Sequence, residues 1–238
     1  MENQKVLVII PAYNEQENIE KVLKALEQSY PWIDCVVIND ASTDKTEQIL
    51  KSCKANYVTL PLNLGIGGGV QTGYQYAKER NYDIAVQMDG DGQHLPEYLD
   101  DVIRPVMDGR ADVVIGSRFI KKEGFQSSAG RRLGIRLLSF MIKILCGSRI
   151  KDVTSGYRAV NRKYIDLFSK EYAQDYPEPE ALVQCSLSGA RIMEIPVVMK
   201  ERTGGSSSIT IFKSVYYMIK VSLALVLQKI SWNGGKYK

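Results

Sequence analysis

The sequence contains few of the residues that build zinc sites or disulfide frameworks. It has 238 residues but only four cysteines and one histidine. Cys35, Cys53, Cys146 and Cys185 are widely spaced, and they form neither a CxxC pair nor a cluster with histidine. This spacing excludes the common zinc-binding patterns and does not suggest disulfides, so we expect reduced thiols in a cytosolic setting.

Long apolar runs are also missing. The first one, at residues 5–10, is too short for a signal peptide, and no cleavage pattern follows it. Near the C-terminus the longest stretch without charge covers residues 221–228. Because a helix needs about 20 apolar residues to cross a bilayer, we expect neither an export signal nor a membrane-spanning segment.

An excess of one charge sign is absent as well. The formal net charge is +4, with 24% charged and 45% hydrophobic residues. So small a charge gives no support for nucleic-acid binding, for which basic residues are usually more numerous and clustered. The length and composition suit one large globular domain.

Up to about residue 116, short apolar runs alternate with amphipathic stretches, which is typical of parallel strands joined by crossover helices. The expected strands cover residues 6–10, 35–38, 57–60, 84–88 and 113–115. The expected helices cover residues 16–28, 43–53, 69–78 and 96–107. In such doubly wound α/β sheets, ligands bind beyond the carboxyl ends of the strands, so the loops there are the candidate site.

After residue 116 the alternation stops. We expect a loop at 121–130, a basic amphipathic helix at 131–145, a helix at 179–187 and a strand at 192–199. A helical tail follows at 209–232. We divide the chain into a main domain, residues 1–208, and an amphipathic tail, residues 209–238, that lies on a membrane surface or docks on a partner.

The segment QMDGDGQ, residues 87–93, places two carboxylates on either side of a glycine at the end of a buried strand. Asp89 and Asp91 can turn toward one point beyond the sheet, with Gln93 as a third ligand. Mg²⁺ and Mn²⁺ prefer such oxygen ligands and often take the rest of their shell from substrate phosphates. The alternative is a solvated acidic turn, because Asp-Gly pairs are common in turns.

Two further loops carry polar residues that suit a nucleoside. In NDASTDKT, residues 39–46, helix capping accounts for one or two of the polar side chains. It does not account for Asp40, which can accept hydrogen bonds from a base or ribose. In PAYNE, residues 11–15, Tyr13 can stack on a base and Glu15 can bind a ribose hydroxyl.

The glycine-rich segment NLGIGGG, residues 63–69, precedes a predicted helix, so its backbone amides can approach a diphosphate closely. It is not a dinucleotide fingerprint. Counted from Gly65 or Gly67, the position of the third glycine is Val70 or Thr72. No Walker A sequence occurs anywhere in the chain.

Eight short motifs occur in a fixed order. They are PAYNE at 11–15, NDASTDKT at 39–46, NLGIGGG at 63–69, MDGDGQH at 88–94, GSRF at 116–119, DVTSGYR at 152–158, PEPEAL at 177–182 and ERTGGSSSI at 201–209. The series resembles family 2 glycosyltransferases of the GT-A fold, most closely the polyprenyl-phosphate sugar transferases of the dolichyl-phosphate mannose synthase type. The QxxRW motif of many polysaccharide-extending relatives is absent.

The resemblance implies a GT-A fold, which is a Rossmann-like, mostly parallel sheet with helices on both faces. It implies a nucleotide-sugar site formed by Pro11, Tyr13, Glu15, Asp40, Gly65, Gly67, Asp89 and Arg118. It implies that Asp89, Asp91 and Gln93 hold Mg²⁺ or Mn²⁺. It also implies that Arg118 and Arg202 face phosphates, and that Glu180 and residues 152–158 shape the acceptor pocket.

The chemistry of such a transfer assigns roles to these residues. Departure of a nucleoside diphosphate builds negative charge that a divalent ion and an arginine can stabilise, so Asp91 and Arg202 join the catalytic set. Attack on the far face of the anomeric carbon inverts its configuration. A phosphate acceptor is already largely anionic at neutral pH, whereas a sugar hydroxyl needs a base, for which Asp152 and Glu180 are candidates. His94 is either a loop residue beside the metal or a catalyst.

We therefore expect transfer of a hexose or N-acetylhexosamine, UDP-linked by preference, to undecaprenyl phosphate or a similar lipid at the cytoplasmic membrane face. The basic helix and the tail suit a peripheral membrane protein, although the helix can equally pack on the domain with its basic face in water. A small hydrophobic membrane subunit is expected by analogy. The alternatives are extension of a polysaccharide at a hydroxyl, a nucleotidyltransferase, whose GxGxRxxP pattern is lacking, and a non-catalytic binding module.

Overall fold

The computed structural model describes residues 4–121, 123–125, 128–200 and 211–232, with the backbone alone for residues 211–216. These residues form a seven-stranded sheet. Its strands are β1 (Val6–Ala12), β2 (Asp34–Asn39), β3 (Tyr57–Thr59), β4 (Ile84–Gln87), β5 (Val113–Ser117), β6 (Arg158–Asn161) and β7 (Ile192–Pro196). The strand order is β3-β2-β1-β4-β6-β5-β7, and only β6 runs antiparallel to its neighbours.

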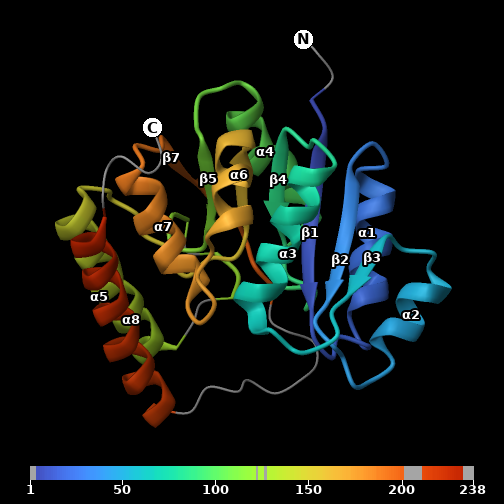
Figure 1. The fold of residues 1–238 in the computed structure, drawn as a ribbon, viewed down its shortest axis with the longest axis horizontal. Coiled ribbons are helices and arrows are strands. Elements are labelled where there is room, and N and C mark those ends of the chain that lie inside the picture. Colours follow the sequence, from blue (N-terminus) through green and yellow to red (C-terminus); the bar gives the residue numbers. More distant parts are fainter. Residues whose placement is uncertain (1–3, 122, 126–127, 201–210, 233–238) are drawn as a thin grey trace.

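Helices cover both faces of this sheet (Figure 1). They are α1 (Ile19–Ser29), α2 (Thr46–Ser52), α3 (Gly65–Glu79), α4 (Leu99–Met107), α5 (Ala129–Cys146), α6 (Arg162–Lys170), α7 (Pro177–Leu187) and α8 (Ile211–Ser231). A short 3₁₀ turn, Pro96–Tyr98, leads into α4. This arrangement confirms the GT-A architecture expected from the sequence.

Strand geometry divides the core into two clusters. Successive strand residues point to opposite faces, so Leu7 and Ile9 pack with α3, α6 and α7, whereas Val8 and Ile10 pack with α1, α2 and α4. β1 is buried along its whole length because helices cover both of its faces. The sheet is therefore a rigid support for the loops at its carboxyl edge.

The sequence predicts the parallel strands well and the antiparallel one not at all. All five strands expected before residue 116 are present, and the later strand is confirmed from Ile192 but ends at Pro196 instead of residue 199. β6 and α6 were not predicted. β6 is only four residues long, RAVN, and a charged residue at one end and an amide at the other leave no apolar run to recognise.

Helices α5 and α8 confirm the two amphipathic segments expected in the second half of the chain. They pack against each other and against α7 at one side of the molecule (Figure 1). The expected boundary between domain and tail, after residue 208, lies outside the described residues and stays a prediction. In the part of the chain that the structure describes, no helix is both long and apolar enough to cross a membrane.

The glycine-rich segment differs from the expectation. α3 begins at Gly65 and not at residue 69, so the glycines form the first turns of the helix instead of a loop before it. Further along, a Cβ atom added to Gly73 would overlap with Cγ2 of Ile9, which is fully buried in β1. Glycine at this position lets α3 lie directly on the sheet.

We predict that Gly73→Ala lowers the free energy of unfolding by about 1–3 kcal/mol, because the buried, β-branched Ile9 cannot move aside cheaply. Urea denaturation followed by circular dichroism measures this change. Gly130→Ala is the matched control, since among the described residues no non-local atom lies within 4 Å of the added Cβ. Equal stability of the two variants would show that α3 does not approach β1 this closely.

Candidate active site

The candidate site lies where the carboxyl ends of β2, β1 and β4 come together. These strands are neighbours in the sheet and parallel, so the segments that follow them emerge at the same edge. They are residues 40–46, 13–18 and 88–94, which include three of the motifs found in the sequence. The fold therefore brings together loops that are up to about 80 residues apart in the chain, as expected for ligand sites of doubly wound sheets.

Asn14 ties the first two loops together. Its side-chain Oδ1 accepts hydrogen bonds from the backbone amides of Thr43 (2.8 Å) and Asp44 (3.3 Å). The backbone N–H of Asn14 donates to Ser42 Oγ (3.0 Å). Asn14 adopts a φ of 55°, a left-handed conformation that asparagine tolerates better than most residues. Sequence reasoning passed over Asn14, although its place in PAYNE was a signal.

The proposed nucleoside ligands have different environments. Tyr13 is 48% exposed, so its ring is accessible for stacking. Glu15 is buried and accepts a hydrogen bond from Asn18 Nδ2 (3.0 Å). Asp40 is buried, and its Oδ1 accepts from the amide of Leu64 (2.7 Å). Both acids thus help to fix their loops, which leaves Tyr13 as the residue of the three most open to a ligand.

The two glycines assigned to the nucleotide sugar also differ. Gly65 has a φ of +75°, and in the described part of the chain no non-local atom lies within 4 Å of an added Cβ. At Gly67, an added Cβ would overlap with the carbonyl oxygens of Ala173 and Gln174. Packing against the α6–α7 connection therefore accounts for Gly67, while Gly65 stays a candidate.

Asp89 and Asp91 stand on a tight turn directly after β4. Asp91 Oδ1 accepts a hydrogen bond from the amide of Gln93 (3.0 Å), and Gly92 adopts a φ of +76°. Gln93 directs its Nε2 to the carbonyl of Lys200 (3.2 Å), so its Oε1 is the amide atom that remains for a ligand. The segment is an Asp-Gly turn, and that turn presents oxygen atoms outward.

These oxygen atoms suit Mg²⁺ or Mn²⁺. Room for the Asp89 carboxylate depends on Gly156, where an added Cβ would lie 3.0 Å from Asp89 Oδ1 and 3.2 Å from Oδ2. Across the described residues, no three side chains of the His, Cys, Asp and Glu types come close enough to hold an ion on their own. Two carboxylates and an amide therefore need further oxygen ligands, which the phosphates of a bound nucleotide can supply.

The structure decides between the two interpretations of His94. The ring is buried, stacks on Tyr157 with 4.9 Å between ring centroids, and accepts the backbone N–H of Asp89 at Nδ1 (3.0 Å). Burial lowers the pKa of His94 to about 4, so the ring is neutral at pH 7 with its proton on Nε2. His94 therefore fits the interpretation as a loop residue that holds the backbone of the turn in place.

Arg118 and Asp152 form a buried ion pair. Arg118 donates from Nε to Asp152 Oδ2 (2.7 Å) and from Nη2 to Oδ1 (2.6 Å), and its backbone amide also donates to Oδ2 (3.0 Å). The Asp152 side chain is fully buried. The expectation that Asp152 is a general base is therefore wrong: both oxygens already accept from a permanently charged arginine, and no acceptor can reach them.

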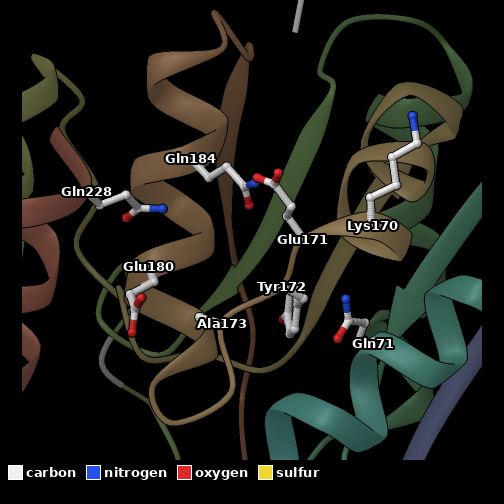
Figure 2. Close-up of a pocket in the computed structure, with 8 residues that line it drawn as sticks. All are labelled: Gln71, Lys170, Glu171, Tyr172, Ala173, Glu180, Gln184 and Gln228. Carbon is white, nitrogen blue, oxygen red and sulfur yellow. The ribbon is translucent and has the colours of Figure 1, made fainter. Parts of the chain in front are cut away.

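Glu180 lies in a different place from the Asp89–Gln93 turn, and its expected role at the acceptor stays a prediction. Its side chain lines an open hollow of about 410 Å³ between α7, α3 and α8, together with Gln71, Lys170, Glu171, Tyr172, Ala173, Gln184 and Gln228 (Figure 2). Burial and the negative charge of Asp175 raise the pKa of Glu180, and Lys220 opposes them. None of these residues belongs to the Asp89–Gln93 turn.

The neighbouring acid, Glu178, has different surroundings. Burial raises the pKa of Glu178, and the negative charge of Asp89 also raises it. Arg158, fully buried at the start of β6, donates from Nη2 to the backbone carbonyl of Glu178 (3.1 Å). Residues two positions apart on a helix point in nearly opposite directions, so the two glutamates of this motif lie in different environments.

Arg202, expected to face a phosphate, lies outside the described residues. Its role stays a prediction.

Comparison with known proteins identifies the family. A sequence profile described as "Glycosyl transferase family 2" matches residues 7–168. The chain belongs to glycosyl transferase family 2. This match confirms the resemblance found from the eight motifs.

Several characterised relatives of this family 2 glycosyltransferase act on lipid phosphates, according to their names. This chain is 32% identical over 217 residues to an undecaprenyl-phosphate mannosyltransferase from Micrococcus luteus, and the match covers 87% of this chain and 88% of the relative. It is 28% identical to a UDP-N-acetylglucosamine–dolichyl-phosphate N-acetylglucosaminyltransferase from Methanococcus voltae, covering 95% and 100%.

Among solved structures, this fold is similar to glucosyl-3-phosphoglycerate synthase from Mycobacterium tuberculosis in complex with Mn²⁺, UDP and phosphoglyceric acid. The TM-score is 0.73 at 18% identity, covering 97% of this chain and 80% of that one. At this identity the likeness shows a shared fold.

We predict that Asp152→Ala lowers the free energy of unfolding by about 3–5 kcal/mol, because it leaves the Arg118 guanidinium buried without its carboxylate. Chemical denaturation measures the loss. Replacing both partners, Arg118→Met with Asp152→Leu, recovers much of that stability, since no uncompensated charge remains. A double variant no more stable than Asp152→Ala would contradict a role for the pair as a unit.

Proposed function

We propose that this family 2 glycosyltransferase moves a hexose or N-acetylhexosamine from a nucleotide sugar to a polyprenyl phosphate, such as undecaprenyl phosphate. The donor is UDP-linked by preference, and the product serves a cell-surface polysaccharide or another glycan. The observation that carries the proposal is the Asp89–Gln93 turn. It presents carboxylate and amide oxygens at the edge of the sheet, beside the loop that exposes Tyr13.

The names of the relatives support a lipid phosphate as the acceptor. Three relatives are named for undecaprenyl-phosphate mannose transfer, dolichyl-phosphate N-acetylglucosamine transfer and polyprenol monophosphomannose synthesis. Two of these names give mannose and one gives N-acetylglucosamine, whereas a polyprenyl or dolichyl phosphate occurs in all three. Related folds that hold UDP together with Mn²⁺ or Mg²⁺ support a metal-dependent nucleotide donor.

The residues of the site would have two roles in the reaction, metal binding and stabilisation of the leaving group. Asp89, Asp91 and Gln93 would hold the divalent ion, which when bound supplies positive charge against the departing diphosphate. Arg118 lies close enough to His94 for its charge to depress the pKa of that ring, so its charge also reaches the turn. Because the Asp152 pair fixes the guanidinium in advance, little reorganisation is needed as charge develops on the leaving group.

The acceptor decides whether a general base is needed. A phosphate monoester has a second pKa near 6, so at neutral pH its oxygen is already largely anionic and attacks without help. A sugar hydroxyl has to lose a proton as it attacks. Transfer to a hydroxyl of a lipid-linked or surface polysaccharide is the second candidate function. For it we propose Glu178 as the base, because the Asp152 carboxylate is paired with Arg118.

We propose that the reaction takes place at the inner face of the cell membrane, where a polyprenyl phosphate and a nucleotide sugar meet. The protein would be peripheral there. A small hydrophobic membrane subunit stays an expectation by analogy with related enzymes.

We predict that membranes containing undecaprenyl phosphate and a divalent ion yield a labelled lipid from one of a panel of UDP- and GDP-sugars. Asp91→Ala lowers this transfer on the order of 100-fold or more, since the leaving group loses its counter-charge. Scintillation counting of the extracted lipid measures it. Asp101→Ala, at an exposed position of α4, is the matched control. Undiminished transfer by Asp91→Ala would contradict the assignment of this turn to the metal site.

We predict that Glu178→Gln changes the turnover number for transfer to polyprenyl phosphate less than tenfold, because that acceptor needs no base. Transfer to a hydroxyl would instead fall by about 10²–10⁴-fold. Rates with both acceptor classes measure the difference. Glu180→Gln is the control on the same helix. It leaves either rate unchanged, since Glu180 lines the hollow near α3 and α8 and is not part of the Asp89–Gln93 turn (Figure 2).

A further inference from the structure

Helices α5 and α8 carry two exposed rows of large apolar side chains. On α5 the row consists of Leu133, Leu137, Phe140 and Ile144. On α8 it consists of Ile219, Leu223, Leu227 and Ile230. These eight side chains are between 49% and 74% exposed, although each helix also has a buried side facing the core. Core packing therefore accounts for one side of each helix and leaves the other without an explanation.

The two rows belong to one surface, which we call the α5/α8 face. The helices are in contact, and Gly134 of α5 lies so close to α8 that an added Cβ would be 2.9 Å from Met218 Sδ. Figure 1 shows both helices on one side of the molecule, with α7 between them and the sheet. The exposed rows follow helical spacings of three and four residues, so they run along the helices as continuous stripes.

Basic residues predominate in these two helices, although Lys220 is paired with Asp175 (2.6 Å). The α5 sequence holds four basic residues and the α8 sequence three, and neither holds an acidic one. Since the whole chain has a net charge of only +4, the remainder of the sequence is net acidic. On α5, helical geometry places exposed Arg136 and Lys143 beside the apolar row, on the side away from Gly134 and α8.

We infer that the α5/α8 face docks on an anionic lipid bilayer. Apolar side chains enter the acyl region next to the headgroups, while the basic side chains along their edge meet lipid phosphates. A second copy of the chain is a poorer occupant, because a twofold interface would bring the same basic edge against itself. This docking goes beyond the transfer reaction and requires neither donor nor acceptor.

The position of the face relative to the candidate site agrees with this orientation. Tyr217 of α8 packs its ring against Tyr176, the residue before α7, with 4.6 Å between ring centroids, and α5 packs on α7 as well. In the first turn of α7, the carbonyl of Glu178 accepts a hydrogen bond from Arg158, which lies opposite Gln87, the last residue of β4. The start of α7 therefore links the two helices to the strand that leads into the Asp89–Gln93 turn, and a bilayer against the face would lie on that side of the active site.

Binding of the full chain to vesicles tests the inference without any substrate. Flotation is compared between vesicles of phosphatidylcholine alone and vesicles that also contain phosphatidylglycerol, with no nucleotide sugar or polyprenyl phosphate present. We expect the chain to float with the anionic vesicles and to be released by high salt. Arg136→Glu should lower the partition coefficient on the order of tenfold or more, and Leu137→Asp and Leu223→Asp should lower it at least as far.

Matched controls separate the face from general surface effects. Lys21→Glu reverses an exposed charge on α1, and Trp32→Asp places an acid at an exposed aromatic residue outside the two helices. Both controls should bind as the unchanged chain does. Equal losses in controls and face variants, or failure of the unchanged chain to bind either vesicle, would overturn the inference. So would a dimer in lipid-free solution that Leu137→Asp dissociates, since the occupant would then be a second copy.

The outcomes also separate this inference from the proposed function. A chain that binds anionic vesicles but transfers no sugar refutes the transfer reaction alone. A chain that transfers sugar to a lipid in detergent but never binds vesicles refutes the docking face alone.

Discussion

The buried pair of Arg118 and Asp152 joins the segment after β5 to the loop that leads into β6. Arg118 follows β5, and its side chain also donates to Thr154 Oγ1 (2.9 Å). Asp152 extends the connection, since its amide donates to Glu194 Oε1 in β7 (2.9 Å). One ion pair therefore joins the end of β5, the segment before β6 and the edge strand. A buried pair adds little net stability but strongly disfavours any arrangement that separates its partners. The positions of Gly156 and the Asp89 carboxylate depend on that arrangement.

The sequence predicted the first half of the fold because its pattern is local. A buried parallel strand shows as a short apolar run, and a crossover helix as apolar residues at three- and four-residue spacing. The Asp89–Gln93 turn was recognisable for the same reason, since its three oxygen-bearing residues lie within five positions. β6 was missed because its assignment depends on pairing with β4 and β5, which are far away in the chain.

The errors in the site have a common physical cause. Asp152 and Arg118 were each considered alone, yet their contact spans 34 positions and one satisfies the other. Glu180 and Glu178 occupy one motif, and only the fold shows that Glu180 lines the hollow near α3 and α8. Asn14 was overlooked because its partners lie in another loop. In each case the residue type was visible in the sequence, and the partner was not.

The antiparallel strand β6 has a consequence for the order in which the chain can fold. It lies between β4 and β5, so these two strands, although consecutive in sequence, never pair with each other. During synthesis the first four strands can form their own parallel sheet, but β5 cannot join it until residues 158–161 have left the ribosome. Until then β4 has an unpaired edge, which is the kind of surface on which aggregation begins. The four-residue strand that gives the weakest signal in the sequence is thus the one that completes the sheet.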